Sequence, residues 1–215
     1  MKRLFLALIL FTLISTSHAQ FIRGYGIKVG TTISNQDWQY SFSSGLSDLS
    51  FEPDNRVGLN IGVFLELLNV PLISIVTEVN YDQKGMKQEI LVVTEPPPNV
   101  TGEYITWGTR VDYISIAALG KVRFSIGIFT PYILLGPKID FEINIVNSFG
   151  AVNEVEENFN KNIFGFKVGV GTEINLLSIN LLAEILYDAD FNELYENQNL
   201  KVDSNSLELR IGLML

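Results

Sequence analysis

From Lys161 to the C-terminus, apolar residues alternate with polar residues and glycine at a period of two. In the final segment the apolar positions are Leu207, Leu209, Ile211, Leu213 and Leu215, and Ser, Glu, Arg and Gly lie between them. A period of two places the two sets on opposite faces of a β-strand. A strand with one oily face and one polar face fits a barrel that closes on itself in a membrane, with the oily face outward.

The same alternation recurs back to Tyr25 and predicts eight strands. Their ranges are Gly24–Ile33, Arg56–Leu67, Leu72–Lys84, Arg110–Phe124, Pro131–Val146, Lys161–Asn175, Ile179–Ala189 and Asn205–Leu215. The predicted fold class is therefore all-β: an eight-stranded antiparallel up-and-down transmembrane β-barrel.

The connections between these strands alternate in length. Three are tight, namely Leu68–Pro71, Ser125–Thr130 and Leu176–Ser178. Four are long, namely Ser34–Asn55, Gly85–Thr109, Asn147–Asn160 and Asp190–Ser204. Short periplasmic turns and long outer loops alternate in this way in outer-membrane barrels, so both termini are expected to face the periplasm.

A transmembrane helix is the alternative interpretation of Val57–Val76, a segment long enough to cross a bilayer with Glu66 as its only charge. At a period of two, however, its branched residues sort onto one face and Gly58, Asn60 and Glu66 onto the other. The breaker at Pro71 then falls where a hairpin turns. The segment is therefore expected to form two strands.

The N-terminus has the features of a secretory signal peptide: Lys2 and Arg3, an apolar run to Ile14, and small residues before Gln20. Cleavage after Ala19 leaves residues 20–215 as one barrel domain. It removes the single histidine of a chain without cysteine, and the formal charge moves from −9 to −11 with the loss of the two basic residues. So acidic a chain is not expected to bind nucleic acid.

The mature chain lacks the side chains that most catalytic and metal sites need. Without His or Cys it cannot form a Ser-His-acid or Cys-His arrangement, or a zinc site built on those ligands. Carboxylate pairs remain as acid and base, for example Asp140 with Glu142. We expect no enzyme, with no catalytic residue, cofactor or metal site.

The polar face of the strands predicts which charges point into the lumen. They are Lys28, Glu66, Glu78, Lys121, Arg123, Lys138, Asp140, Glu142, Lys167, Glu173, Glu184, Glu208 and Arg210. An eight-stranded barrel is only wide enough for its own side chains, and charges in such a space must pair. A salt-bridge network that fills the lumen is favoured over a proton or ion path.

Aromatic residues gather near the predicted strand ends, where membrane barrels carry interfacial girdles. They are Tyr25, Tyr104, Trp107, Tyr113, Phe124, Phe129, Tyr132, Phe164, Phe166, Tyr187 and Phe191. The long loops are acidic, and Glu154, Glu156 and Glu157 form one cluster there. Such carboxylates either hold divalent cations or form a solvated surface, and the spacing favours the solvated surface.

Short segments along the whole mature chain resemble PorT-like outer-membrane β-barrel proteins. These are Gly26-Ile-Lys-Val-Gly30 with Ser34-Asn35, Glu78-Val-Asn-Tyr81 with Lys84-Gly85, Pro131-Tyr132 with Gly136-Pro137, Gly165 through Gly171-Thr-Glu173, and Leu207-Glu-Leu-Arg-Ile-Gly212. The resemblance implies an eight-stranded barrel in the outer membrane of a Bacteroidota-type bacterium, inserted by the barrel-assembly machinery. The family's namesake is associated with protein secretion, and no catalytic residues carry over.

Three functions follow as alternatives. The first is a small barrel, embedded in outer-membrane lipid, with a structural, adhesive or secretion-accessory role and a protein partner at its outer loops. The second is a narrow pore for ions or small solutes. The third is a soluble lipocalin-like periplasmic binder, whose apolar face would point inward.

Overall fold

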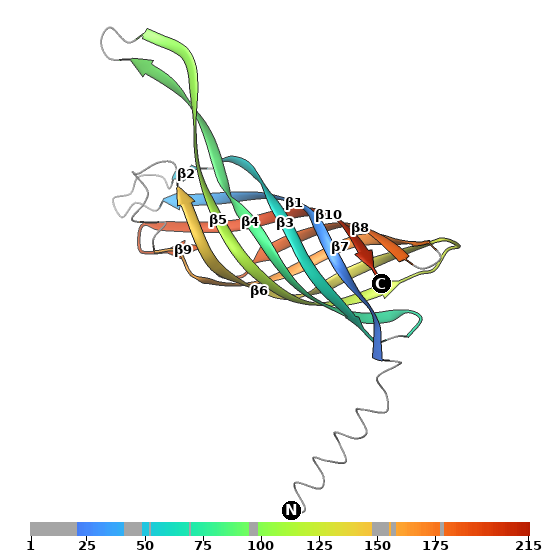
Figure 1. Ribbon diagram of the computed structural model, residues 1–215. Helices are drawn as coiled ribbons and strands as arrows, with labels where there is room; N and C mark the ends of the chain where they lie inside the picture. The colour runs from blue at the N-terminus through green and yellow to red at the C-terminus, as the bar shows by residue number, and fades with distance from the viewer. Residues whose placement is uncertain are drawn as a thin grey trace, which may run out of the picture.

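The computed structural model describes residues 21–40, 49–51, 53–68, 70–94, 99–147, 155, 158–176 and 179–215 (Figure 1). The expected signal peptide and its cleavage site lie outside these residues. The strands are β1 (Ile22–Tyr40), β2 (Leu49–Phe51), β3 (Asp54–Leu67), β4 (Ile73–Thr94), β5 (Asn99–Arg123), β6 (Phe129–Asn147), β7 (Asn162–Leu176), β8 (Ile179–Asp190), β9 (Tyr195–Glu196) and β10 (Leu200–Met214). None of the described segments is a helix long and apolar enough to cross a bilayer.

Eight long antiparallel strands form a closed ring. They follow the order β1-β3-β4-β5-β6-β7-β8-β10, and β10 pairs back onto β1 with partners such as Val29 and Ile211. The short strands β2 and β9 add to β1 and β10 at one end of the ring. The predicted eight-stranded up-and-down barrel is confirmed, and closure leaves no sheet edge within the ring.

The tight turns and both ends of the described chain lie at the same end of the barrel. β3–β4, β5–β6 and β7–β8 are joined there by short segments, and Gly26 of β1 pairs with Met214 of β10. Two turn residues, Leu68 and Gly127, have positive φ angles of 63° and 64°. By the rule for outer-membrane barrels this is the periplasmic end.

At the opposite end the strands continue beyond the predicted boundaries. Residues 34–40, 54–55, 85–94, 99–109 and 200–204 were predicted as loops, and that prediction is wrong because the structure places them in β1, β3, β4, β5 and β10. The β4–β5 hairpin extends furthest and projects beyond the rest of the barrel (Figure 1).

An inversion of the two faces explains this error. Along β1, Ile27 and Val29 face outward and Lys28 is buried inside, but further along Gln39 is exposed and Trp38 is buried. The strand therefore passes from a membrane-like pattern to the pattern of a water-soluble barrel with an apolar interior. From this point the alternation of a membrane barrel no longer predicts the strand, although the strand itself continues.

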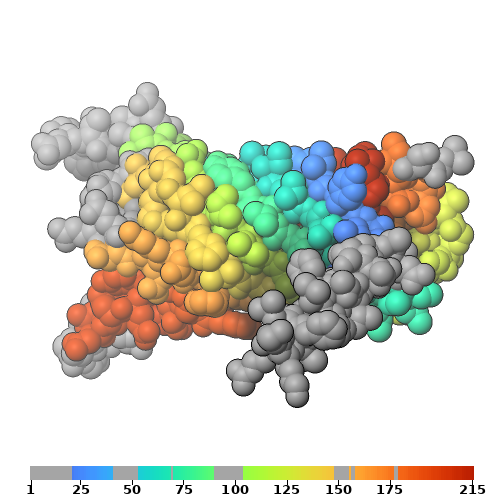
Figure 2. Space-filling model, turned by 60° about the horizontal axis from the view of Figure 1, so that its bottom comes forward, coloured from blue at the N-terminus to red at the C-terminus, as the bar shows by residue number. Residues whose placement is uncertain are grey.

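Apolar side chains cover the outside of the ring. On the face that Figure 2 shows, neighbouring strands pack against each other where they are not covered by grey atoms. Ile27, Val63, Val170 and Ile211 are 60%, 56%, 55% and 64% exposed. An apolar surface of this extent marks contact with lipid in a barrel of this kind. The outward direction of these residues contradicts the lipocalin-like alternative, which needs them inside.

The predicted aromatic girdles are only partly present. Tyr25, Phe124 and Phe129 are exposed near the periplasmic end. Tyr113 and Tyr132, by contrast, are 2% exposed and lie inside the barrel, so their prediction as girdle residues is wrong. They occupy inward positions of their strands. Nearness to a strand end does not show whether an aromatic side chain points toward the lipid or into the lumen.

Candidate functional site

The lumen is filled by buried charges in three layers along the barrel axis. The inner layer lies at the periplasmic end, where Glu66 receives hydrogen bonds from Arg23 (2.8 Å) and Lys121 (3.0 Å), and Glu173 receives them from the same two cations. Arg123 adds a bond to Glu66 and also binds the carbonyl oxygens of Val70 and Pro71 in the β3–β4 turn. The inner layer thus joins the lumen to a periplasmic turn.

The middle layer contains Lys28, Glu78, Glu184 and Arg210. Arg210 bonds both carboxylates, with Nη1–Oε2 of Glu78 at 2.8 Å and Nη2–Oε2 of Glu184 at 2.7 Å. Lys28 also bonds both, and the Tyr132 hydroxyl donates to Glu184 at 2.7 Å. Every carboxylate of this layer therefore faces two cations from other strands.

The outer layer contains five carboxylates and three lysines. Lys84 bonds Asp140 and Asp188 at 2.8 and 2.7 Å, and Lys138 bonds Asp140 and Asp190 at 2.6 Å each. Lys167 bonds Glu208 at 2.6 Å. The fifth carboxylate is Asp82, which accepts a hydrogen bond from Thr32. This layer meets the middle one where Arg210 lies 3.3 Å from Glu208.

The structure brings together all of the thirteen charges predicted to point inward except Glu142. The other twelve are at most 5% exposed and lie in the three layers. Glu142 is half-buried near the outer rim, next to an irregularity in the β5–β6 pairing between Asp112 and Tyr113, and no ion pair within the described residues joins it to the layers. Glu142 still pairs in register with the buried Tyr113, one inward position beyond the Ser115–Asp140 pair, so it lies past the outer layer.

Five charged members of the layers were missed from the sequence: Arg23, Asp82, Lys84, Asp188 and Asp190. The parity of Glu78 along β4 already assigned Asp82 and Lys84 to the inner face, so the signal was present. Arg23 differs, because its parity pointed outward. A register shift between Ile22 and Gly24 turns its side chain into the lumen, which no period-two pattern reveals.

Close packing between strands lets long side chains cross the lumen. A Cβ on Gly171 would lie 2.6 Å from the ring of Tyr132, and one on Gly165 would lie 2.5 Å from Cε of Lys138. The ring of Tyr132 in turn supports the ammonium of Lys121, whose Nζ lies 4.0 Å from the ring centre. Glycine at these two positions therefore makes room for two members of the network.

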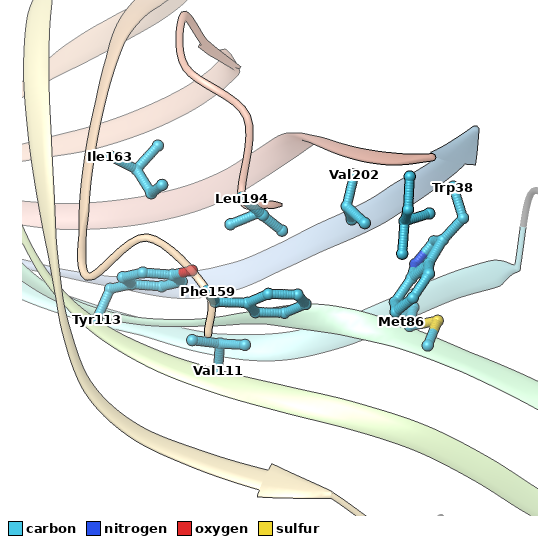
Figure 3. Close-up of a cluster of buried hydrophobic side chains, with 9 residues drawn as sticks. Trp38, Met86, Val111, Tyr113, Phe159, Ile163, Leu194 and Val202 are labelled. Atoms are coloured by element: carbon cyan, nitrogen blue, oxygen red, sulfur yellow. The ribbon is translucent and has the colours of Figure 1, made fainter. Parts of the chain in front are cut away.

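An apolar plug closes the barrel above the outer layer. Figure 3 shows its side chains converging inside the outer end, from five long strands (β1, β4, β5, β7 and β10) and from the segments before β7 and β9. The buried members are Trp38, Met86, Val111, Tyr113, Phe159, Ile163, Leu194, Leu200 and Val202. The plug separates the charged layers from the outer solution.

The β4–β5 hairpin is the most prominent feature outside the plug. β3 pairs with β4 as far as Lys87, and β6 pairs with β5 from Thr109 onward. Within the described part of the chain no third strand pairs with the two-stranded ribbon of residues 88–94 and 99–106, which continues to the Thr94–Asn99 pair. Tyr104 and Ile105 on this ribbon are 65% and 56% exposed.

The outer surface near β9 carries a small charge cluster. Lys201 lies 3.1 Å from Asp203 and 3.2 Å from Glu193. Hydrogen bonds to these two carboxylates raise the pKa of the Lys201 ammonium. The acidic cluster at Glu154, Glu156 and Glu157 lies outside the described residues.

A closed ring of eight strands, an apolar outer wall and a polar lumen define an integral β-barrel protein of the bacterial outer membrane. The chain belongs to the family of the outer membrane protein beta-barrel domain, whose family model matches residues 19–196. Membership in the narrower PorT-like group is not part of that match.

Several solved outer-membrane barrels are similar to this chain. The attachment invasion locus protein Ail of Yersinia pestis is 14% identical, with 89% of this chain and 98% of that one covered and a TM-score of 0.42. Neisserial surface protein A is 12% identical, with 89% and 96% covered and a TM-score of 0.47. OprG from Pseudomonas aeruginosa is 10% identical, with 91% and 97% covered and a TM-score of 0.49. No curated protein matches the sequence.

Proposed function

We propose that this protein is a closed outer-membrane barrel that presents its β4–β5 hairpin to a protein partner, in an adhesive or secretion-accessory role. The observation that carries the proposal is the projecting ribbon of residues 88–94 and 99–106 on a barrel whose own interior is filled. The activity is one of binding and not of catalysis. Insertion into the membrane depends on the barrel-assembly machinery.

The interior supports a binding role better than a transport role. A pore needs a continuous path of water, whereas this lumen holds three layers of paired charges with the apolar plug above them. Opening such a path requires breaking buried ion pairs, at about 3–5 kcal/mol for each unmatched charge.

The hairpin offers two kinds of contact to a partner. Its strand edges carry backbone N–H and C=O groups that an extended segment can pair with. Its exposed Tyr104 and Ile105 add apolar surface outside the membrane. Neither feature is needed to close the barrel, because the ring is complete without the ribbon.

The proposal is tested by shortening the hairpin. Lys87 and Gly108 are direct partners, so an Asn-Gly turn that replaces residues 88–107 preserves the register of the strands below. The shortened protein should still show the heat-modifiable folded band and should lose its partner. As a second test, a photo-crosslinking residue at Ile105 should capture a protein in intact cells, whereas the same residue at the lipid-facing Val63 should not.

Two results would contradict the proposal. One is a protein adduct that forms equally at Ile105 and at Val63, because contact would then not be specific to the hairpin. The other is a shortened, folded variant that still forms the same complexes as the native protein.

A further inference from the structure

The three layers of the lumen do not have the same charge balance. The inner layer has three cations (Arg23, Lys121, Arg123) and two carboxylates, and the middle layer has two of each. In the outer layer five carboxylates face Lys84, Lys138 and Lys167, and the one further cation that reaches them among the described residues is Arg210 of the middle layer, 3.3 Å from Glu208. The outer layer therefore carries two negative charges in excess when all of its groups are ionised.

Three of those carboxylates converge on one point. Asp82, Asp188 and Glu208 come from β4, β8 and β10, all are buried, and each offers an oxygen within 4.8 Å of the others. Asp188 is paired with Lys84 at 2.7 Å and Lys138 at 2.5 Å, but the other two carboxylates share one lysine. Lys167 is 2.6 Å from Glu208 but 3.9 Å from Asp82. Oδ2 of Asp82 and Oε2 of Glu208 accept no hydrogen bond, although Nη1 of Arg210 lies 3.3 Å from Oε2 of Glu208.

Neutral oxygen donors beside this cluster also lack partners. Asn60 is 0% exposed, and neither Oδ1 nor Nδ2 of its amide has a hydrogen bond. It is the direct cross-strand partner of Asp82, and both side chains face the lumen. Cβ atoms of such a pair lie about 4.5–5.5 Å apart, so the amide reaches the same point as the carboxylate. Ser206 is placed similarly opposite Asp188, and its hydroxyl is also buried without a partner.

Counter-ions from bulk solution do not compensate this charge, because the apolar plug lies above it and the other two layers lie below. Uncompensated charge in such a site is costly, and an unbonded buried amide adds to the cost. A group that removes both costs must be positive, must accept oxygen ligands and must be small enough to fit among the strands.

We propose that the outer layer binds one hard divalent cation of the Ca²⁺ class, held by Asp82, Asp188 and Glu208 with the amide oxygen of Asn60. Carboxylate and amide oxygens are the ligands that Ca²⁺ prefers, and its flexible geometry tolerates donors from four different strands. The double positive charge matches the excess of two carboxylates. Lys167 stays on Oε1 of Glu208, while Oε2 faces the ion on one side and Arg210, 3.3 Å away, on the other. The site is separate from the hairpin, so it does not depend on the proposed partner.

The test uses the full mature chain, folded in detergent with Ca²⁺ and then desalted. The native protein should retain about one Ca²⁺ per chain by elemental analysis, and EDTA present during refolding should lower its urea midpoint. Asp82→Asn keeps the shape and the Thr32 hydrogen bond but removes one ligand charge. It should retain no Ca²⁺ and should have the same midpoint with Ca²⁺ and with EDTA.

Glu173→Gln is the matched control, because it removes a carboxylate from the inner layer instead. It should lower the midpoint in both conditions and still retain Ca²⁺. The proposal is overturned if the native protein retains no Ca²⁺ and its midpoint ignores EDTA. It is also overturned if the metal-free native protein becomes more stable as the pH falls while Ca²⁺ has no effect, because a bound proton would then balance the charge.

Discussion

The substitution Glu66→Gln tests whether the layers hold the barrel together. Glu66 is fully buried and accepts hydrogen bonds from Arg23, Ser74, Lys121 and Arg123. Glutamine has nearly the same volume but no charge, and its amide nitrogen is a donor that faces other donors. The inner layer, which already has one more cation than carboxylates, would then have an excess of two.

The expected cost follows from that loss. Removing one partner of a buried ion pair costs about 3–5 kcal/mol, and the remaining partner Glu173 already serves Arg23 and Lys121. With a urea m-value of about 2 kcal/mol/M, the unfolding midpoint should fall by about 2 M. The assay is reversible urea unfolding in detergent, followed by tryptophan fluorescence and by the heat-modifiable band on a gel.

The matched control is Glu196→Gln, the same chemical change on the exposed strand β9. It should alter the free energy of unfolding by less than about 0.5 kcal/mol, as surface substitutions usually do. If Glu66→Gln were as mild as this control, the paired layers would not contribute to the stability of the barrel, and the reasoning on the lumen would be refuted.

Three further substitutions probe other contacts in the same unfolding assay. Lys167→Ala should cost about 3–5 kcal/mol because Glu208 loses its 2.6 Å partner in a layer that is already negative, and an unchanged midpoint would contradict this. Tyr132→Phe should cost about 1–2 kcal/mol through the lost hydrogen bond to Glu184, less than Lys167→Ala because two cations remain on that carboxylate. Gly171→Ala should cost about 1–3 kcal/mol because the new Cβ meets the Tyr132 ring, and the double variant with Tyr132→Ala should recover part of that loss.

The sequence predicts the membrane-spanning part of the fold well, because there each strand has one face in lipid and one in a polar lumen. The period-two alternation then predicts which side chains point into the lumen, and Lys28, Glu78 and Arg210 do lie together inside the barrel. It also predicts the turns at the periplasmic end: the predicted strands stop at Leu67 and Phe124, and β3 and β5 end at Leu67 and Arg123.

The outer part of the fold was harder to predict because the polarity of the faces inverts. Trp38 faces inward there and Gln39 faces outward, so a strand continues while its pattern reverses. Gly85 and the three prolines at 96–98 made the region between them look like a loop. The run Ile90–Thr94, in which every residue except Leu91 is β-branched, was the signal for a strand, since such residues favour extended backbone.

A backbone irregularity and the position of the outermost inward residue account for the remaining errors in the lumen. A shift of register near Arg23 turns an outward position inward, whereas Glu142 pairs with Tyr113 and lies beyond the outer layer. Such bulges depend on how neighbouring strands pair, which is a property of the assembled sheet. The pairing of strands in the assembled sheet also determines which lumen charges meet. Arg210 and Glu78, for example, form an ion pair although they are far apart in sequence.

The central claim is that the barrel is closed by its own side chains, and planar-bilayer recording of the purified, folded protein tests it most directly. With the apolar plug above three layers of paired charges, insertion should produce no stable unitary current steps. Reproducible unitary steps from the folded native protein would show an open path through the lumen and would contradict the account.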